Sequence, residues 1–162
     1  MKRLPAGRQG WVRLLNSSRS TGSYFIFVKA MTPKLTLGKN ERLKSRKAIE
    51  QLFKEGQRFT LSPFKISYLI SSGKGLQFGV GAGTKNFKKA VDRNKIKRLT
   101  REAWRLQKNP LQKQIEEKNT GLSIFFIYTG KELPDYRLVY DKVDLILTRL
   151  VKLINENATT HT

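Results

Sequence analysis

The chain has 162 residues, 38% of them apolar, which suits a single domain that can bury a real core. Its 33 Lys and Arg against 12 Asp and Glu give a net charge of +21, so a nucleic acid is the leading partner and an anionic membrane surface is the rival. No run approaches the roughly 18 apolar residues of a membrane-spanning helix. The absence of cysteine excludes disulfides and thiolate metal sites and suits a reducing cytoplasm, and a lone histidine at position 161 argues against a His-dependent triad or zinc site.

Residues 1–30 carry six bases and no acids and show no sustained periodicity. We expect a disordered arm or an over-extended reading frame with the true start at Met31, and a targeting peptide is the weaker alternative. Without this segment the charge is still 27 minus 12, or +15, so the basic character does not depend on it. The domain proper is expected over 31–157, followed by a frayed tail over 158–162.

One helix and one short strand are predicted first. Ser45 is a suitable N-cap for a helix that runs to about Lys54, and Gly56 is the expected stop. A short strand follows over 59–62, and Pro63 breaks it.

Two longer strands are expected next. Residues 64–70 alternate, and the apolar members of one face are Phe64, Ile66, Tyr68 and Ile70. Segment 71–75 is a turn signal, so 76–83 is predicted to be the returning strand of a hairpin. The glycines of this strand do not make a dinucleotide-binding loop, because Thr84 stands where the third glycine belongs, and they indicate a tight turn or a close approach of backbone instead.

The most informative run is 84–105, which predicts a helix from about Ala90 to Lys108 and carries nine bases but two acids. An α-helix turns by about 100° per residue, so bases at every fourth position lie on one face. Two further polar residues lie beside them on this face. These residues are Arg93, Lys97, Arg101 and Arg105, with Asn94 and Arg98. The opposite face is an apolar packing stripe of Ile96, Leu99, Ala103 and Leu106.

Like charges four residues apart repel each other and weaken an isolated helix. An ordinary solvated surface would include glutamates at such positions, so the natural counter-charge here is an external polyanion. The plain alternative is a basic face that meets only solvent.

The rest of the chain predicts a short polar helix over 111–118, a buried central strand over 122–128, a loop over 130–140 and a last helix over 141–156. The last helix has one apolar face, which is expected to be core. Helices and strands in this order predict an α+β domain, with helices packed on a small mixed sheet.

Aromatic residues give a second indication of RNA binding. Phe53, Phe64 and Tyr68 are candidates for a shallow cleft in which rings stack on unpaired bases, and packing in the core is the equal alternative for any one ring. Tyr68 is expected to be the most exposed, because its hydroxyl needs a partner. The scattered acids assemble no site for a metal-dependent nuclease, so no catalytic or metal-binding residue is expected on the protein.

Segments 41–56 and 90–102 together closely resemble the protein component of bacterial ribonuclease P. The second segment is similar to that family's signature, an Arg-Asn-Arg motif followed by Lys-Arg and then Arg-Glu. The resemblance covers roughly residues 35–155. It implies an α-β sandwich, ribosomal protein S5 domain 2-like, with a left-handed βαβ crossover that departs from the usual right-handed rule.

The resemblance also implies a function. The chain would be a cytoplasmic subunit that binds ribonuclease P RNA and the 5′ leader of precursor tRNA, without an obligatory protein partner. The holoenzyme would remove the leader by hydrolysis, with the chemistry and the Mg²⁺ ions held mainly by the RNA. A structural ribosomal protein or RNA chaperone is the alternative, and a self-sufficient nuclease is a third.

The basic run and the resemblance together give the expected RNA-binding residues: Lys85, Lys88, Lys89, Arg93, Asn94, Lys95, Lys97, Arg98, Arg101 and Arg105. The expected leader cleft comprises Phe53, Phe64, Tyr68 and Ile49. Three positions depart from the family pattern. Lys95 stands where Arg is commoner and so lacks the bidentate fork, Asn86 replaces the second lysine of a pair, and Ile49 stands where an aromatic is frequent.

Overall fold

The computed structural model of the protein describes residues 36–73 and 75–159. The expected arm over 1–30 lies outside the described residues. The elements in chain order are α1 (Arg46–Glu55), β1 (Gln57–Leu61), β2 (Phe64–Ser71), β3 (Gly75–Ala82), α2 (Ala90–Gln107), α3 (Asn109–Glu117), β4 (Gly121–Tyr128) and α4 (Tyr136–Thr159).

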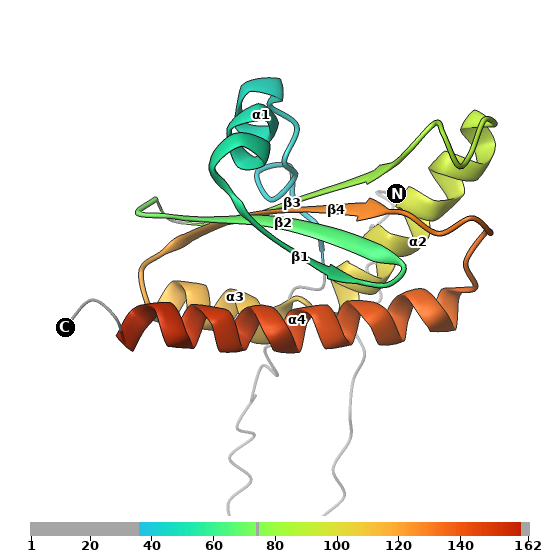
Figure 1. Ribbon diagram of the computed structural model, residues 1–162. Coiled ribbons are helices and arrows are strands. Elements are labelled where there is room, and N and C mark those ends of the chain that lie inside the picture. Colours follow the sequence, from blue (N-terminus) through green and yellow to red (C-terminus); the bar gives the residue numbers. More distant parts are fainter. Residues whose placement is uncertain (1–35, 74, 160–162) are drawn as a thin grey trace, which may run out of the picture. The chain divides into compact units, whose positions relative to one another are not determined.

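The four strands form one mixed sheet in the order β1-β2-β4-β3 (Figure 1). β4 pairs antiparallel with β2 and parallel with β3, so the predicted central position of this strand is confirmed. The predicted hairpin between the strands that flank 71–75 is wrong, because β4 lies between them. The apolar strand β4 is most stable with a paired strand on each of its edges, and here these are β2 and β3. The turn signal over 71–75 gave no information about this pairing. The connection through α2 and α3 joins the parallel neighbours β3 and β4.

Helices lie on both faces of the sheet, as Figure 1 shows, with α1 on one face and α3 and α4 on the other. α1 begins where predicted, since the Ser45 Oγ accepts a hydrogen bond from the Ala48 N–H at 3.4 Å. It also ends at Gly56, whose φ of −71° is open to any residue. Glycine is needed there for space, because a Cβ would lie 2.3 Å from the carbonyl oxygen of Leu52.

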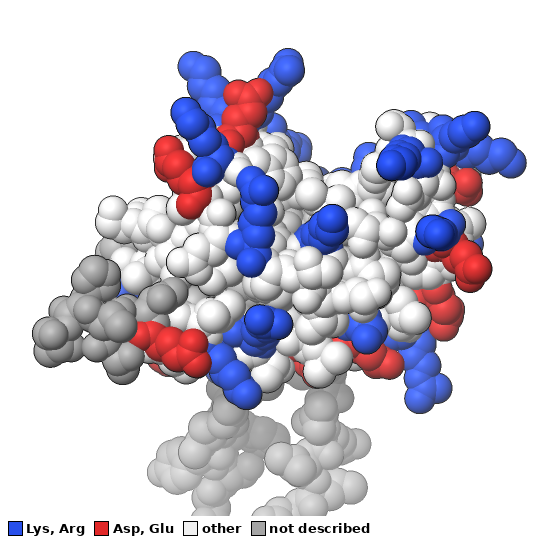
Figure 2. All heavy atoms as spheres, in the orientation of Figure 1, with Lys and Arg blue, Asp and Glu red and all other residues white. Residues whose placement is uncertain are grey.

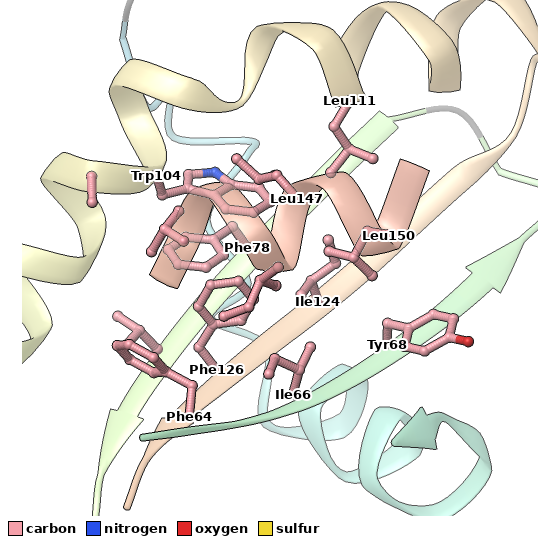
Figure 3. Close-up of a cluster of buried hydrophobic side chains, with 14 of the residues drawn as sticks. Phe64, Ile66, Tyr68, Phe78, Trp104, Leu111, Ile124, Phe126, Leu147 and Leu150 are labelled. Atoms are coloured by element: carbon pink, nitrogen blue, oxygen red, sulfur yellow. The ribbon is translucent and has the colours of Figure 1, made fainter. Parts of the chain in front are cut away.

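The main core fills the space between the sheet and the helices α2 and α4 (Figure 3). At its centre the rings of Phe78 and Trp104 stack at 4.2 Å, and both meet Phe126 edge-on, at 5.1 and 5.7 Å. Aromatic contacts of this kind add to the free energy gained by burial. These three rings therefore fasten α2 to the two parallel strands.

α4 begins at Tyr136, five residues before the expected start at Asp141, so the loop predicted over 130–140 is wrong in its second half. The physical reason is Val139, which is fully buried and continues the apolar stripe one turn before Val143. The expected core face is otherwise confirmed. Its buried members are Val143, Ile146, Leu147, Leu150 and Ile154, with Val151 partly buried.

Candidate nucleic-acid interface

α2 packs through a face close to the predicted stripe but rotated from it. Ile96, Ala103 and two residues that the prediction omitted, Thr100 and Trp104, are fully buried. Leu99 and Leu106, which belonged to the predicted stripe, are only partly buried. The Thr100 hydroxyl donates to the Ile96 carbonyl at 2.9 Å, so its burial leaves no unmet hydrogen bond. Figure 2 shows Lys and Arg side chains gathered over the N-terminal end of this helix, and basic and acidic side chains together over α1, with a mostly uncharged surface between the two.

The opposite face of α2 presents the predicted cations to solvent. Asn94, Lys95, Arg98 and Arg101 are exposed, and Lys97 is partly exposed. Among the ion pairs of the described residues, the only base of α2 that takes part is Arg105. The face therefore keeps an excess of positive charge that ion pairs among residues 36–73 and 75–159 do not neutralise.

Arg93, the first residue of the signature, faces the loop before the helix. Its Nη1 donates hydrogen bonds to the carbonyl oxygens of Phe87, at 2.8 Å, and Lys88, at 2.6 Å. Arg93 is partly buried, unlike Asn94 next to it. It therefore fastens the loop to the first turn of α2, and at least one of its donor atoms is already engaged.

The loop over 83–89 is held at a second point by Asn86. The Asn86 Nδ2 donates to the carbonyl oxygens of Thr129, at 2.9 Å, and Gly130, at 3.1 Å. Phe87 is buried, and its ring lies 5.9 Å from that of Tyr128. Asn86 thus ties this loop to the end of β4. The expected RNA-binding lysines of the loop remain exposed, namely Lys85, Lys88 and Lys89.

Glu102 is paired with Arg105 one turn along α2. The Glu102 carboxylate accepts from Arg105 Nε at 2.9 Å and from Nη2 at 2.5 Å. This hydrogen bonding, more than the nearby charges, lowers the pKa of Glu102, and the same pair raises the pKa of Arg105. The guanidinium is thereby oriented by a fixed partner.

A second surface lies where α1 covers the sheet. The ring of Phe53 meets that of Phe125 edge-on at 5.3 Å, and both rings are partly exposed. Phe125 points to this face because β4 alternates, and it lies over two residues of β3 without side chains, Gly79 and Gly81. Ile49 is also partly exposed. Phe125 was not among the predicted cleft residues, although the alternation of 122–128 contains the signal.

Two residues assigned to the leader cleft are buried on the opposite face of the sheet. Phe64 is 0% exposed and Tyr68 is 4% exposed, so the expectation that Tyr68 is the most exposed ring is wrong. The Tyr68 hydroxyl donates to Gln57 Oε1, and burial raises the pKa of this tyrosine. Alternation predicted correctly that the two rings share a face. It did not reveal that α4 covers this face and not α1.

Among residues 36–73 and 75–159, no three His, Cys, Asp or Glu side chains come together in a group that could hold a metal ion. Mg²⁺ binds in proteins through carboxylates and water, and the exposed face of α2 is cationic. The donor set of this surface therefore does not fit a bound Mg²⁺. Within the same residues, no helix is both long and apolar enough to cross a membrane.

Known proteins of one family are similar to this chain in sequence. The family model for Ribonuclease P matches residues 37–151. A ribonuclease P protein component from Porphyromonas gingivalis strain W83 is 34% identical over 129 residues, covering 78% of this chain and 94% of that protein. Another from Dictyoglomus turgidum is 37% identical over 78 residues, covering 48% of this chain and 65% of that protein.

Solved structures show the same fold. The ribonuclease P protein from Thermotoga maritima superimposes with a TM-score of 0.52 at 27% identity, over 67% of this chain and 96% of that chain. The ribonuclease P protein from Staphylococcus aureus gives 0.54 at 18% identity, over 68% of this chain and 94% of that chain, which bears on the fold alone. The chain belongs to the ribonuclease P protein family.

Proposed function

We propose that this chain binds the catalytic RNA of ribonuclease P and the 5′ leader of precursor tRNA in the cytoplasm. The leader is then removed hydrolytically to give the mature tRNA 5′ end. Membership of the family supports a role in a tRNA-processing ribonuclease with an RNA partner. In this proposal the reacting groups and the Mg²⁺ ions belong to the RNA. The protein supplies binding, which suits a surface rich in cations and poor in carboxylates.

One observation carries the proposal, namely the division of α2 into a buried back and a cationic front. Trp104 and Ile96 anchor the back in the core. The front presents Lys95, Arg98 and Arg101 without ion-pair partners among the described residues. Phosphates of an RNA backbone are natural counter-ions for such a face, and each one bound releases condensed cations from the RNA.

The leader is assigned to the surface beside α1. Phe53 and Phe125 are partly exposed rings on this face, and unpaired bases stack on such rings. Lys65 of β2 is exposed, and its register partner on β4 is Ile127, on the same face as Phe125. A single strand with both phosphates and exposed bases matches this mixture of rings and charge.

The proposal is tested by reconstitution with the ribonuclease P RNA of the same organism. The protein is expected to permit cleavage of precursor tRNA at a Mg²⁺ concentration where the RNA alone is nearly inactive. Phe53→Ala is expected to weaken binding of precursor tRNA by about 1–3 kcal/mol, the usual cost of one lost base–ring stack, and to leave leaderless tRNA unaffected.

Leu145→Ala on α4 is the matched control, because it removes a half-exposed apolar side chain from a different surface. Cleavage that the protein does not stimulate would refute the proposal. A Phe53→Ala effect of equal size on both tRNAs would refute the leader assignment alone.

A further inference from the structure

Four arginines from two separate parts of the chain line one hollow beside α2. The hollow has a volume of about 490 Å³. Three of its arginines come from α2, namely Arg98, Arg101 and Arg105. The fourth, Arg42, comes from the segment before α1 and lies outside both the signature and the residues expected to bind RNA.

The backbone at Arg42 is fixed against the edge of the sheet. Arg42 forms an isolated parallel bridge with Phe78 of β3. The Phe78 N–H donates to the Glu41 carbonyl at 2.8 Å, and the Leu43 N–H donates to the Phe78 carbonyl at 3.0 Å. Leu43 is buried. The segment is thus an extension of the sheet at this point, and its side chains alternate in direction.

An ion pair fastens the same segment to the end of α2. The Glu41 carboxylate lies 2.5 Å from the Nζ of Lys108, which is 1% exposed and follows the last residue of α2. Glu41 also accepts a hydrogen bond from the Gly38 N–H at 2.8 Å. Because the segment is held to both β3 and α2, Arg42 has a defined position relative to the arginines of the helix.

The described residues that line the hollow carry more positive than negative charge. Its four arginines and single glutamate leave three positive charges in excess. Glu102 is engaged by Arg105. The Arg42 side chain donates to the carbonyl oxygen of Leu37 at 3.3 Å. Within the described part of the chain, Arg42, Arg98 and Arg101 form no ion pair.

We propose that this arginine hollow binds a phosphate group of the RNA backbone, with Arg42, Arg98 and Arg101 as its donors. This inference rests on the proposed function and adds a contact from outside the signature helix. Guanidinium groups offer paired N–H donors whose spacing matches two phosphate oxygens. Donors from two elements can approach one phosphate from different sides, which a single helix face cannot do.

The test measures the dissociation constant of the full-length protein and its ribonuclease P RNA over a series of KCl concentrations. Arg42→Gln is expected to make the log–log salt slope shallower by about 0.7–0.9, the value for one lost phosphate. It is also expected to weaken binding roughly tenfold, as for a lost charged hydrogen bond. Arg42→Lys should restore the slope but not the full affinity, because it keeps the charge and loses the fork.

Arg46→Gln is the matched control, since Arg46 is an exposed arginine paired with Glu50 at 3.3 Å, and it should keep the parental slope. Thermal unfolding shows whether each variant is folded. Arg101→Gln leaves the segment before α1 intact and should lose as much affinity for the RNA as Arg42→Gln. The double variant should lose less binding free energy than the sum of the two single variants, because both arginines bind one phosphate.

A parental slope for Arg42→Gln, together with a shallower slope for Arg98→Gln, would overturn this inference and leave the proposed function standing. Parental slopes for Arg42→Gln, Arg98→Gln and Arg101→Gln alike would count against the proposed function itself. Inorganic phosphate separates the two sources of the ligand. If Arg42→Gln abolished thermal stabilisation by inorganic phosphate but kept the parental slope with RNA, the hollow would be a site for free phosphate, and the assignment to RNA would be wrong.

Discussion

Individual residues of the signature differ in what they contact. Arg98 and Arg101 face solvent, whereas Arg93 bonds to two carbonyl oxygens of the loop before α2. The sequence predicted one uniform basic face, because helical periodicity places Arg93 and Lys97 one turn apart. Periodicity describes the helix but not the loop that folds back against its first turn. An arginine at this edge of the face can therefore serve the fold as well as the RNA.

Arg93→Gln is expected to loosen the loop over 83–89 in the free protein. The variant loses the donors to Phe87 and Lys88, so backbone amides of this loop should exchange with solvent severalfold faster. Hydrogen exchange with mass spectrometry measures this directly. Arg98→Gln is the control, because it removes the same charge from the exposed face and should leave the exchange unchanged. Equal exchange in the two variants would contradict the assignment of Arg93.

Glu102 makes a small part of the stability depend on pH. Its pKa is lowered in the folded state by the hydrogen bond from Arg105, so the pair stabilises the fold above the ordinary pKa of a glutamate. This stabilisation is lost as the pH falls through the lowered pKa. Because 47% of the Glu102 side chain is exposed, we expect only about 0.3–0.5 kcal/mol near neutral pH.

Urea unfolding of the parent and of Glu102→Gln at several pH values provides the measurement. The difference in unfolding free energy is expected to shrink as the pH falls from neutral toward 3. A difference that stays constant over this range would show that the pair contributes nothing.

At the scale of elements, β3 and β4 pack closely because the ring of Phe125 on β4 lies against Gly79 and Gly81 of β3. A Cβ on Gly79 would lie 2.5 Å from the ring of Phe125, and one on Gly81 would lie 3.1 Å from it. Gly79→Ala therefore forces the ring to shift and is expected to cost roughly 1–3 kcal/mol in unfolding free energy, with Gly81→Ala costing less.

Gly83→Ala is the matched control, because no atom lies within 4 Å of a Cβ there. It should change the stability by no more than about 0.5 kcal/mol. Equilibrium unfolding in urea ranks the three variants. If Gly79→Ala were as stable as Gly83→Ala, the close packing of Phe125 against β3 would be wrong.

The sequence predicted each of these elements but not all of their neighbours. Apolar alternation located β2 and β4, and a cap residue located the start of α1, because these signals are local. The insertion of β4 between β2 and β3 depends on long-range pairing, for which the turn over 71–75 carries no information. The same limit explains why only part of the candidate site could be predicted. The basic face of α2 was predictable from one helix, whereas the burial of Tyr68 and the exposure of Phe125 depend on which helix covers which face of the sheet.

For the whole molecule, electrostatics and packing separate the two proposed RNA surfaces. The net charge of +21 attracts any polyanion, but salt screens that attraction between charges more than about 8–10 Å apart. Specific binding must therefore depend on where the charges are fixed. The fold fixes them over α2, whose back is held by Trp104, and separates them from the rings beside α1.

The salt dependence of binding to ribonuclease P RNA tests the role of α2 most directly. Arg98→Gln/Arg101→Gln removes two charges from the exposed face of this helix, and Arg137→Gln/Lys152→Gln removes two exposed charges from α4. The first pair is expected to make the log–log slope shallower by about 0.7–0.9, the value for the one phosphate that both side chains are proposed to bind, while the second pair keeps the parental slope. Equal slopes for the two double variants would contradict the account, because net charge and not the cationic face of α2 would then hold the RNA.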